Sequence, residues 1–326
     1  MPPTISIAIA TYRRPEFLRE LLNSIQREVE EDPLSVEIIV SDNASGDTTL
    51  EAVRSFTNLD INYVCNETNV GAVENVIRAY SKCTGDYVLL MGDDDLISPG
   101  TLRRIKNAAD SAAPPGLVTG PVMGISVTGV PFDEKVRFPN VAGVNRLFSS
   151  GQDAVEHSFL RASTLSGLAI RRELADANTA RKYAATLYPQ MHMAGVAARD
   201  GGVIYLADPV ALIRDNPERD WSYSGDLMSS GVLEILGELT EGTEWGQAVR
   251  KRVTALRIRA AYGPLYEARS VSFGTFLRLF KGLASVSQYR RSLVFWAIGL
   301  TVGTFGIRGV RLIRRVVKIA GPDHVK

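Results

Sequence analysis

The sequence predicts an α/β protein with a central, mostly parallel sheet, followed by a helical, basic C-terminal region. The first observation is that short apolar runs alternate with segments of helical periodicity, as in parallel sheets with right-handed crossovers. The second is a segregation of charge. Residues 250–326 contain 16 Lys and Arg against two acidic residues, whereas residues 1–249 contain 21 against 34. Such an imbalance predicts a basic segment that meets an anionic surface, either a membrane or a nucleic acid.

The first part of the chain repeats a strand followed by a helix. Pro15 suits the first turn of the first helix, and apolar residues follow it at helical spacing. Asp47 or Thr48 is the expected N-cap of the second helix, and Asn69-Val70-Gly71 opens the third. The expected strands are residues 5–10, 36–40, 61–64 and 87–91.

The second part of the chain has shorter elements. A helix is expected from Ser98-Pro99 to about Ala109, and residues 121–145, rich in Gly and Pro, form a loop or a β-hairpin. Residues 214–226 are polar and contain a Trp and a Tyr, which is typical of a mobile lid. Further strands are expected near residues 116–120, 167–170, 202–206 and 210–213, and further helices after Gly151, up to Asp200-Gly201 and over 228–262.

An acidic run follows the most apolar of the predicted strands. Tyr87–Met91 is too short for a helix and reads as a strand buried on both faces, and Asp93 to Asp95 follow it directly after Gly92. Ligands bind at the carboxyl ends of strands in open α/β sheets. Because side chains alternate along an extended segment, we expect Asp93 and Asp95 to point the same way and to hold Mg²⁺ together with substrate phosphate oxygens. The alternative is a solvated acidic turn.

Composition sets the broad class. The chain has 326 residues, 45% of them hydrophobic and 22% charged, as in ordinary globular proteins. Its two cysteines, Cys65 and Cys83, show no metal-binding spacing and favour a reducing compartment. The N-terminal residues run into a strand without a basic and then apolar secretion signal, so a cytoplasmic location is expected.

Several motifs occur together in a recognisable order. They are Ser6–Pro15, Ile38–Asp47, Asn69-Val70-Gly71, and Gly85-Asp86-Tyr87 running into Asp93-Asp94-Asp95. In this order and spacing the chain resembles family 2 glycosyltransferases, which have the GT-A nucleotide-sugar-binding fold, and among them the sugar transferases of O-antigen and polysaccharide pathways. The resemblance covers roughly residues 4–110 well and 150–215 loosely.

The resemblance implies a role for each motif. It places the nucleotide base and ribose against Thr11, Tyr12, Arg13 and Asp42, and a divalent cofactor, Mg²⁺ or Mn²⁺, on Asp93 and Asp95. It gives Asp94 a contact with the ribose or the sugar. A carboxylate at Asp42 suits hydrogen bonds from a base N–H or a ribose hydroxyl, although an Asp in this position can also simply form a turn.

The general base of the family's inverting members is missing. Those enzymes carry a Glu-Asp pair at the start of the helix that faces the acceptor, where this chain has Pro189 and Gln190. An amide cannot act as a general base. Either the base comes from elsewhere, or this register is wrong, or the enzyme retains anomeric configuration and needs no base there. The nearest candidates for a base elsewhere are Asp153, Glu156 and His192.

The diphosphate-binding segment of the family also departs from its pattern. Relatives often carry Arg and His near the end of the second half, where this chain has Arg214 and Asn216. The guanidinium of Arg214 can still pair with a phosphate through its fork of donors.

The C-terminal region, residues 227–326, is expected to associate with a membrane and to follow a catalytic domain over 1–226. Residues 293–307 carry no charge but are shorter than the roughly 20 residues of a spanning helix. The basic, amphipathic residues 308–318 fit an anionic leaflet. We therefore expect a peripheral protein at the inner face of the cell membrane, acting on a glycan or polyprenyl-linked acceptor. The alternative is a helical pair with a solvated basic face.

Two other functions fit the sequence less well. A nucleotidyltransferase normally has a glycine-rich basic loop after its first strand, and Thr11–Pro15 contains no glycine. A degenerate scaffold or a nucleic-acid binder is permitted by the basic region, but Asp93-Asp94-Asp95 is intact. Nucleic-acid binding also favours aromatic residues interleaved with basic ones, so no nucleic-acid partner is expected.

Overall fold

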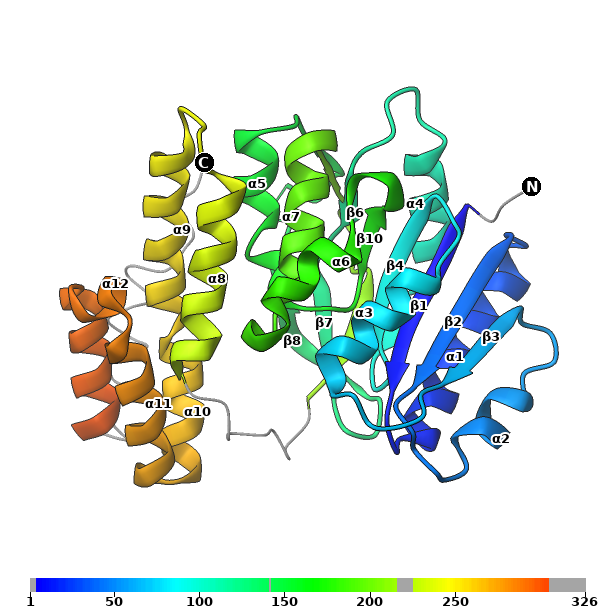
Figure 1. Cartoon of the computed structure of the whole chain (residues 1–326), viewed down its shortest axis with the longest axis horizontal. Helices are drawn as coiled ribbons and strands as arrows, with labels where there is room; N and C mark the ends of the chain where they lie inside the picture. Colours follow the sequence, from blue (N-terminus) through cyan, green and yellow to red (C-terminus); the bar gives the residue numbers. More distant parts are fainter. Residues whose placement is uncertain (1–3, 141, 216–224, 305–326) are drawn as a thin grey trace. The chain divides into compact units, whose positions relative to one another are not determined.

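The computed structural model describes residues 4–140, 142–215 and 225–304 (Figure 1). The chain divides into two compact units, residues 1–218 and 219–326, which are described separately below. The predicted lid over 214–226 falls mostly on residues 216–224, which lie outside the described residues.

The first unit is built on an eight-stranded mixed sheet in the order β3-β2-β1-β4-β10-β6-β11-β9. The first four strands in the chain pair in parallel, as predicted from their apolar runs. They are β1 (Ile5–Thr11), β2 (Val36–Asp42), β3 (Ile61–Cys65) and β4 (Tyr87–Gly92).

Two strands run against the others. β10 (Leu168–Arg171) lies antiparallel between β4 and β6 (Leu117–Thr119), and β9 (Arg146–Phe148) is antiparallel to β11 (Val203–Tyr205). β4 and β6 are both antiparallel to β10, so they run in the same direction, and β11 is parallel to β6. Six strands therefore share one direction, namely β1, β2, β3, β4, β6 and β11. The prediction of a mostly parallel sheet is confirmed.

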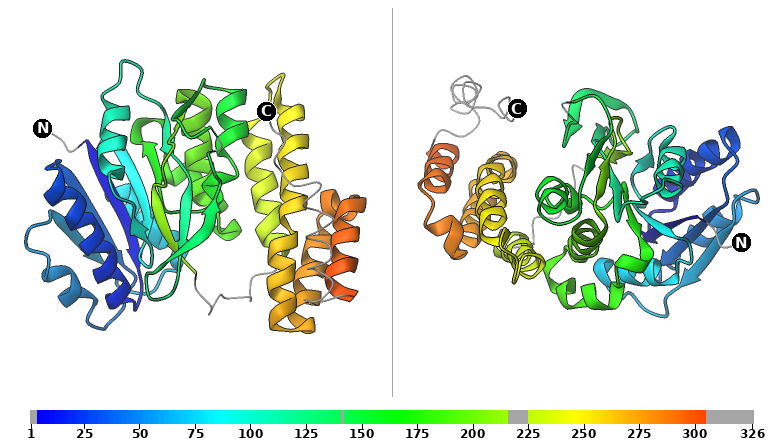
Figure 2. Two further views of the ribbon diagram at one scale, coloured as in Figure 1. Left: turned by 180° about the vertical axis from the view of Figure 1, so that it is seen from behind. Right: turned by 90° about the horizontal axis from the view of Figure 1, so that it is seen from above.

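Helices cover both faces of this sheet (Figures 1 and 2). On one face lie α1 (Pro15–Glu31) and α4 (Thr101–Ala109), and on the other α3 (Ala72–Lys82) and α7 (Pro189–Gly201). Pro15 occupies the first turn of α1 as predicted, and the apolar residues spaced along α1 are buried against Ile5, Ile7 and Ile9 of β1. The shorter helices are α2 (Thr49–Arg54), α5 (Gln152–Ser158) and α6 (Ala177–Ala180).

A second sheet of four strands, in the order β5-β12-β7-β8, begins directly after the acidic run. Of the two alternatives for residues 121–145, the hairpin is the correct one, since β7 (Val122–Ile125) and β8 (Pro131–Arg137) pair antiparallel. β12 (Ala211–Arg214) pairs with both β7 and β5 (Leu96–Ile97). This arrangement brings Arg214 back to the segment that follows β4.

The second unit is helical. The residues predicted to be helical over 228–262 form α8 (Gly225–Leu239) and α9 (Gly246–Ala260), with a break after Leu239 in which Gly242 has a positive φ of 69°. Within the described residues, no helix is long and apolar enough to cross a bilayer. The other helices of this unit are α10 (Tyr262–Val271), α11 (Phe273–Ser285), α12 (Ser287–Arg290) and a helical segment over residues 293–304.

Candidate active site

The carboxyl ends of β1, β2 and β4 meet at one edge of the large sheet. Thr11 is in register with Asp42, and Ala10 is in register with Gly92. The loops that carry the predicted nucleotide-binding residues and the acidic run therefore leave the sheet side by side. This is the edge where open α/β sheets bind their ligands.

The acidic run is a turn, which we call the acidic turn (Asp93–Asp95). Its backbone is closed by a hydrogen bond from the N–H of Asp95 to the carbonyl of Gly92 at 3.2 Å. The expectation of an extended segment is therefore wrong, and strand alternation does not set the direction of these side chains. Asp93 and Asp95 are only 6% and 8% exposed, so they are not the solvated residues of an ordinary acidic turn.

Asp93 faces the loop after β1. Its carboxylate accepts hydrogen bonds from the hydroxyl of Thr11 at 2.8 Å and from Arg14 Nη1 at 3.1 Å. The same Arg14 nitrogen lies 3.0 Å from Asp94 Oδ2, so one guanidinium bridges two acids. Sequence reasoning missed Arg14, although its place immediately before Pro15 puts it at the N-cap of α1, beside this edge of the sheet.

Asp95 contacts the segment before β10 and the end of β12. It accepts hydrogen bonds from the hydroxyl of Ser166 at 2.5 Å and from the backbone N–H of Arg214 at 2.9 Å. The Ser166 hydroxyl in turn accepts the N–H of Gly92 at 2.8 Å. Ser166 was also missed, because only the antiparallel placement of β10 beside β4 brings residue 166 to this position.

Burial dominates the electrostatics of the acidic turn. Desolvation raises the pKa of Asp93 to about 6, against the lowering effects of Arg14 and Thr11. Desolvation and the neighbouring charge of Asp94 raise the pKa of Asp95 to about 7. The local protein donors therefore offset only part of the cost of burying these two carboxylates.

Arg214 contacts the backbone of the acidic turn, and its side chain does not face an open site. Its side chain is only 2% exposed and pairs with Glu20. Its Nε donates to the carbonyl of Asp94 at 2.7 Å, and its guanidinium lies over the ring of Phe17. These contacts favour a positioning role over the predicted contact with a phosphate.

Arg161 is a second buried arginine that sequence reasoning missed. It is 1% exposed, and burial lowers its pKa to about 10. It donates to the carbonyls of Gly120 at 2.7 Å, Thr164 at 3.1 Å and Ser166 at 2.8 Å. Arg161 therefore fixes the loop that carries Ser166 to Asp95.

The predicted nucleotide-binding residues lie together after β1 and β2. Asp42 is buried, and its carboxylate accepts hydrogen bonds from the N–H of Ser45 at 3.1 Å and from the hydroxyl of Tyr63 at 2.5 Å. Burial and this bond raise the pKa of Tyr63. Arg13 is exposed, has a positive φ of 55°, and lies over the ring of Tyr12 at 5.0 Å. Asp42 thus orders the loop, and its contact with a nucleotide stays a prediction.

A buried amide ties these loops together. Asn75 on α3 donates to the carbonyls of Thr11 at 3.3 Å and Ser41 at 2.8 Å, and it accepts from Asn66 at 2.8 Å. Its side chain thereby joins the carboxyl ends of β1 and β2 to the loop after β3. The polar network makes this edge of the sheet rigid, because each bond restrains a different loop.

The candidates for a general base lie at different edges of the sheet. Gly201, at the end of α7, accepts from the N–H of Gly116 just before β6, so the C-terminal end of α7 lies at the amino edge of the sheet. Gln190 is in the first turn of this 13-residue helix, about 16 Å from Gly201 along the helix axis and toward the carboxyl edge. Both Gln190 and His192 are buried, and the ring of His192 lies 5.1 Å from that of Tyr183.

Asp153 is not brought to the acidic turn, and this expectation is corrected. It is exposed in the first turn of α5, two residues after Gly151. The N–H of Gly151 donates to the carbonyl of Arg199 near the C-terminal end of α7, which places Asp153 at the amino edge. The sequence could not show this, because the direction of β9 determines on which edge α5 begins.

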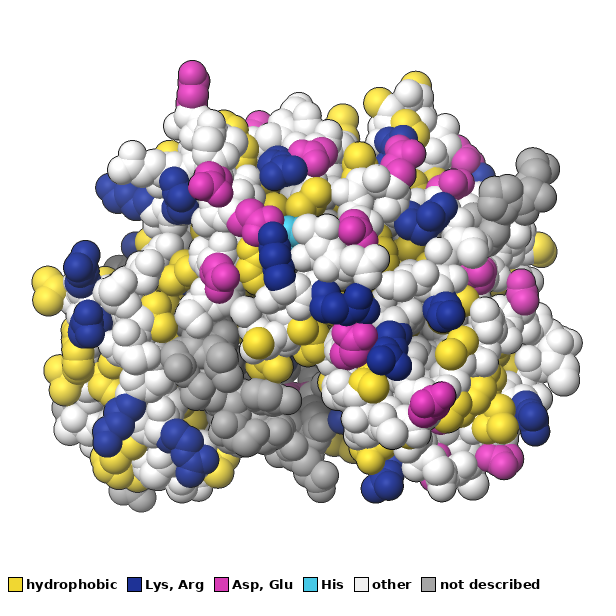
Figure 3. All heavy atoms as spheres, in the orientation of Figure 1, with side chains coloured by type: hydrophobic (Ala, Val, Ile, Leu, Met, Phe, Trp, Pro, Cys, Tyr) yellow, Lys and Arg dark blue, Asp and Glu magenta, His cyan; other side chains and the backbone are white. Residues whose placement is uncertain are grey.

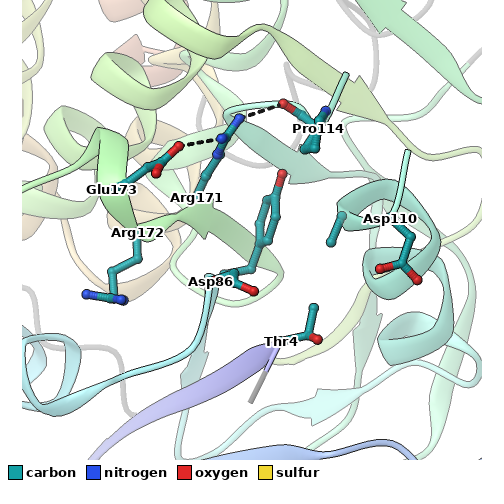
Figure 4. A pocket seen from close by; sticks show the side chains of 9 residues that line it. Thr4, Asp86, Asp110, Pro114, Arg171, Arg172 and Glu173 are labelled. Carbon is teal, nitrogen blue, oxygen red and sulfur yellow. Dashed lines mark hydrogen bonds and ion pairs between the residues drawn. The ribbon is translucent and has the colours of Figure 1, made fainter. Parts of the chain in front are cut away.

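A cavity of about 260 Å³ also lies at the amino edge (Figure 4). In it, Arg171 pairs with Glu173 and donates to the carbonyl of Pro114 at 3.1 Å. Thr4 and Asp86, which precede β1 and β4, also line it. This cavity therefore lies at the edge of the sheet opposite the edge that carries the acidic turn.

The acidic turn fits a hard cation in its donor set. A Cβ at Gly92 would lie 3.2 Å from an oxygen of Asp95 and 3.3 Å from one of Asp94, so glycine leaves room for two carboxylates to approach one point. Carboxylate oxygens are the ligands that Mg²⁺ and Mn²⁺ prefer. Within the described ranges, no group of three or more His, Cys, Asp or Glu side chains is placed to hold a metal ion.

Comparison with known proteins supports the fold and identifies the family. The abequosyltransferase RfbV of Salmonella typhimurium is 40% identical over 112 residues, which are 33% of this chain and 33% of that protein. YwdF, an uncharacterised glycosyltransferase of Bacillus subtilis, is 32% identical over 108 residues, 33% of this chain and 39% of the relative. These matches span only about a third of the relatives' length.

Solved structures match over much more of the chain. Residues 1–349 of Staphylococcus aureus TarS, in complex with UDP-GlcNAc, superpose with a TM-score of 0.59 over 94% of this chain and 91% of that one, at 15% identity. The predicted GT-A fold is thereby confirmed. The model of glycosyl transferase family 2 matches residues 6–174, just over half of the chain. The protein therefore belongs to glycosyl transferase family 2.

Proposed function

We propose that this protein transfers a sugar from a nucleoside-diphosphate donor to a hydroxyl of a glycan or lipid-linked oligosaccharide, with a divalent ion, Mg²⁺ or Mn²⁺. The observation that carries the proposal is the buried acidic turn at the carboxyl edge, hydrogen-bonded to the end of β1 through Thr11. The relatives support it, since RfbV is named as an abequosyltransferase and TarS was solved with UDP-GlcNAc.

In this reaction the acceptor oxygen forms a bond to the anomeric carbon while the bond to the diphosphate breaks. The diphosphate leaves with the electron pair, and the proton of the acceptor hydroxyl passes to a general base or to the leaving diphosphate. Thr11, Tyr12, Arg13 and Asp42 lie where the nucleoside would be held. The β1 and β4 loops leave the sheet together, so a donor bound there extends its diphosphate toward the acidic turn.

When bound, the divalent ion would act as a Lewis acid that offsets the negative charge developing on the leaving diphosphate. Asp95 would hold it, with Asp93, the predicted second ligand, or Asp94 supplying the other carboxylate. The chain's own donors orient these acids: Ser166 fixes Asp95, Thr11 fixes Asp93, and Arg14 brings a positive charge to the same turn.

The stereochemical outcome depends on the acceptor side. Gln190 lies toward the carboxyl edge and cannot take a proton from the acceptor, while Asp153 is at the opposite edge. A base from elsewhere, a different register against the family's Glu-Asp pair, and retention of configuration are the three alternatives. The anomeric configuration of the product, read by NMR, separates retention from the other two: an inverted product requires a protein base, whereas with retention the leaving diphosphate can take the acceptor's proton.

The C-terminal region would bring the enzyme to the inner face of the cell membrane, where polyprenyl-linked acceptors are found. The charge of residues 250–326 supports an anionic lipid partner and a peripheral location in the cytoplasm.

The deciding experiment is a screen of UDP-, GDP-, CDP- and dTDP-sugars with Mn²⁺ or Mg²⁺, measuring release of the nucleoside diphosphate and binding by calorimetry. We expect one donor class to be bound and slowly hydrolysed in a metal-dependent manner. The matched control is Asp95→Asn, which should remove the metal dependence. Absence of binding by every donor to the folded wild-type protein would overturn the proposal.

A further inference from the structure

The helical segment 293–304 has one face buried and the other face open. Phe295 and Val302 are fully buried, and Gly299 packs tightly against the ring of Phe280. On the other face Leu293 is 86% exposed, Trp296 38% and Leu300 65%. These three residues, spaced by three and four positions, form a continuous line on a helix, which we call the apolar stripe (Leu293, Trp296, Leu300).

The exposure of Leu293 and Leu300 in the apolar stripe is not explained by packing in the second unit. The core of this unit is already filled by aromatic residues: Phe280 stacks on Phe276 and on Phe295 at centroid distances of 5.7 and 5.0 Å. Single exposed apolar side chains are common on soluble proteins, but a contiguous line of them marks a surface that binds something.

Trp296 has the geometry of an interfacial residue. Its indole Nε1 donates to the carbonyl of Arg290 at 2.8 Å, and its ring meets that of Phe280 edge-on at 5.4 Å. Since the one polar atom of the indole is already hydrogen-bonded, the ring can leave water without an unsatisfied donor. Tryptophans of this kind concentrate at the boundary between lipid and water.

Positive charge lies next to the apolar stripe. Arg290 and Arg291 are both exposed immediately before the segment 293–304. Beyond residue 249 the sequence has 16 Lys and Arg against two acids. Figure 3 shows Lys and Arg side chains beside apolar ones over α10 and α11, at the lower left. Apolar side chains flanked by arginine suit an anionic bilayer, in which the guanidinium groups remain at the headgroups.

We infer that the apolar stripe inserts into an anionic lipid surface, with Arg290 and Arg291 on the lipid phosphates. The charge argues against a second copy of this chain as the occupant, because two such basic surfaces repel each other. The inference rests on the proposed membrane association and specifies which residues carry it.

The test uses the full chain and co-sedimentation with phosphatidylcholine–phosphatidylglycerol vesicles, compared with pure phosphatidylcholine. We expect the wild type to bind the anionic vesicles, and Leu293→Ser/Leu300→Ser to lower the partition coefficient by about tenfold or more. The matched control is Leu147→Ser, which removes a leucine that is 74% exposed on β9 and should leave binding unchanged. Arg290→Gln/Arg291→Gln should reduce the preference for anionic vesicles, and donor hydrolysis should be unchanged in all variants.

The outcomes separate the inference from the proposals on which it rests. If the leucine variant sediments as the wild type does, the apolar stripe is not the contact and membrane binding resides elsewhere in the chain. Failure of the wild type to bind vesicles while it hydrolyses a donor overturns both the membrane association and the stripe, but leaves the reaction intact. A dimer that dissociates in the leucine variant without vesicles would show that the stripe binds a second copy, which also overturns the inference.

Discussion

Thr11 and Asp93 are 82 positions apart in the sequence, yet the hydroxyl of Thr11 donates to the buried carboxylate of Asp93 at 2.8 Å. The bond joins the carboxyl end of β1, where the nucleoside is proposed to bind, to the acidic turn after β4. A shift at one of these positions is thereby transmitted to the other, so this pair couples donor binding to the orientation of the acids.

Thr11→Val keeps the shape of the side chain and removes this hydrogen bond. We expect a loss of about 1–3 kcal/mol in the free energy of unfolding, because Asp93 keeps its burial and loses a donor. Sugar transfer should fall by about tenfold, from a less well oriented turn. Urea unfolding and steady-state kinetics measure the two effects. Thr11→Ser retains the hydroxyl and should recover most of the activity; equal loss in both variants would contradict the role of the bond.

Asp95→Asn should reduce sugar transfer by about 100-fold or more while the protein stays folded, because a neutral amide is a poor ligand for a hard cation. Mn²⁺ titration of Asp93→Asn and Asp94→Asn then identifies the second ligand. The variant with the weaker metal affinity is the one that lacks this ligand. Asp110→Asn is the control, since this exposed acid pairs with Lys106 and lines the cavity at the amino edge. Full activity of Asp95→Asn would exclude a metal on this turn.

The stability of the metal-free protein should fall as the pH rises from about 4 to about 8. The pKa of Asp95 is raised from 3.8 to about 7 and that of Asp93 to about 6, so in this window the folded chain holds protons that the unfolded chain releases. Unfolding in the presence of EDTA at several pH values measures the slope. Asp95→Asn should flatten it. Mn²⁺ should restore stability at high pH, because the metal binds the deprotonated acid. A slope unchanged in Asp95→Asn would contradict the assignment.

Arg161→Met should destabilise the protein by roughly 3 kcal/mol or more, because it leaves the carbonyls of Gly120, Thr164 and Ser166 buried without their donor. Ser166→Ala removes the hydrogen bonds of this hydroxyl to Asp95 and from the N–H of Gly92, and it should cost less stability. It should still lower the affinity for Mn²⁺, since Asp95 loses its orienting donor. Thermal unfolding and metal titration distinguish the two variants. An unchanged metal affinity in Ser166→Ala would rule out this positioning role.

Much of the first unit was predictable from local patterns. The runs at Ile5 and Tyr87 are apolar on both faces, and only a buried parallel strand accommodates such residues at that length. Pro15 marked the start of α1 for a local reason, since its missing N–H costs nothing there. The position of the acidic turn at the end of β4 followed from the same patterns, but its backbone conformation did not.

The sequence by itself determined the alternating strands and helices, the acidic residues at the end of a buried strand, and the basic character of the C-terminal region. Each depends on residues close together in the chain. Only the tertiary structure decided that β10 runs antiparallel beside β4 and thereby brings Ser166 to Asp95. It also decided that Arg14 bridges Asp93 and Asp94. The helix that contains Asp153 begins at the opposite edge of the sheet for the same kind of reason. These relationships follow from strand direction and long-range packing, which the order of residues in one segment does not specify, because a strand of the same composition can pair in either direction.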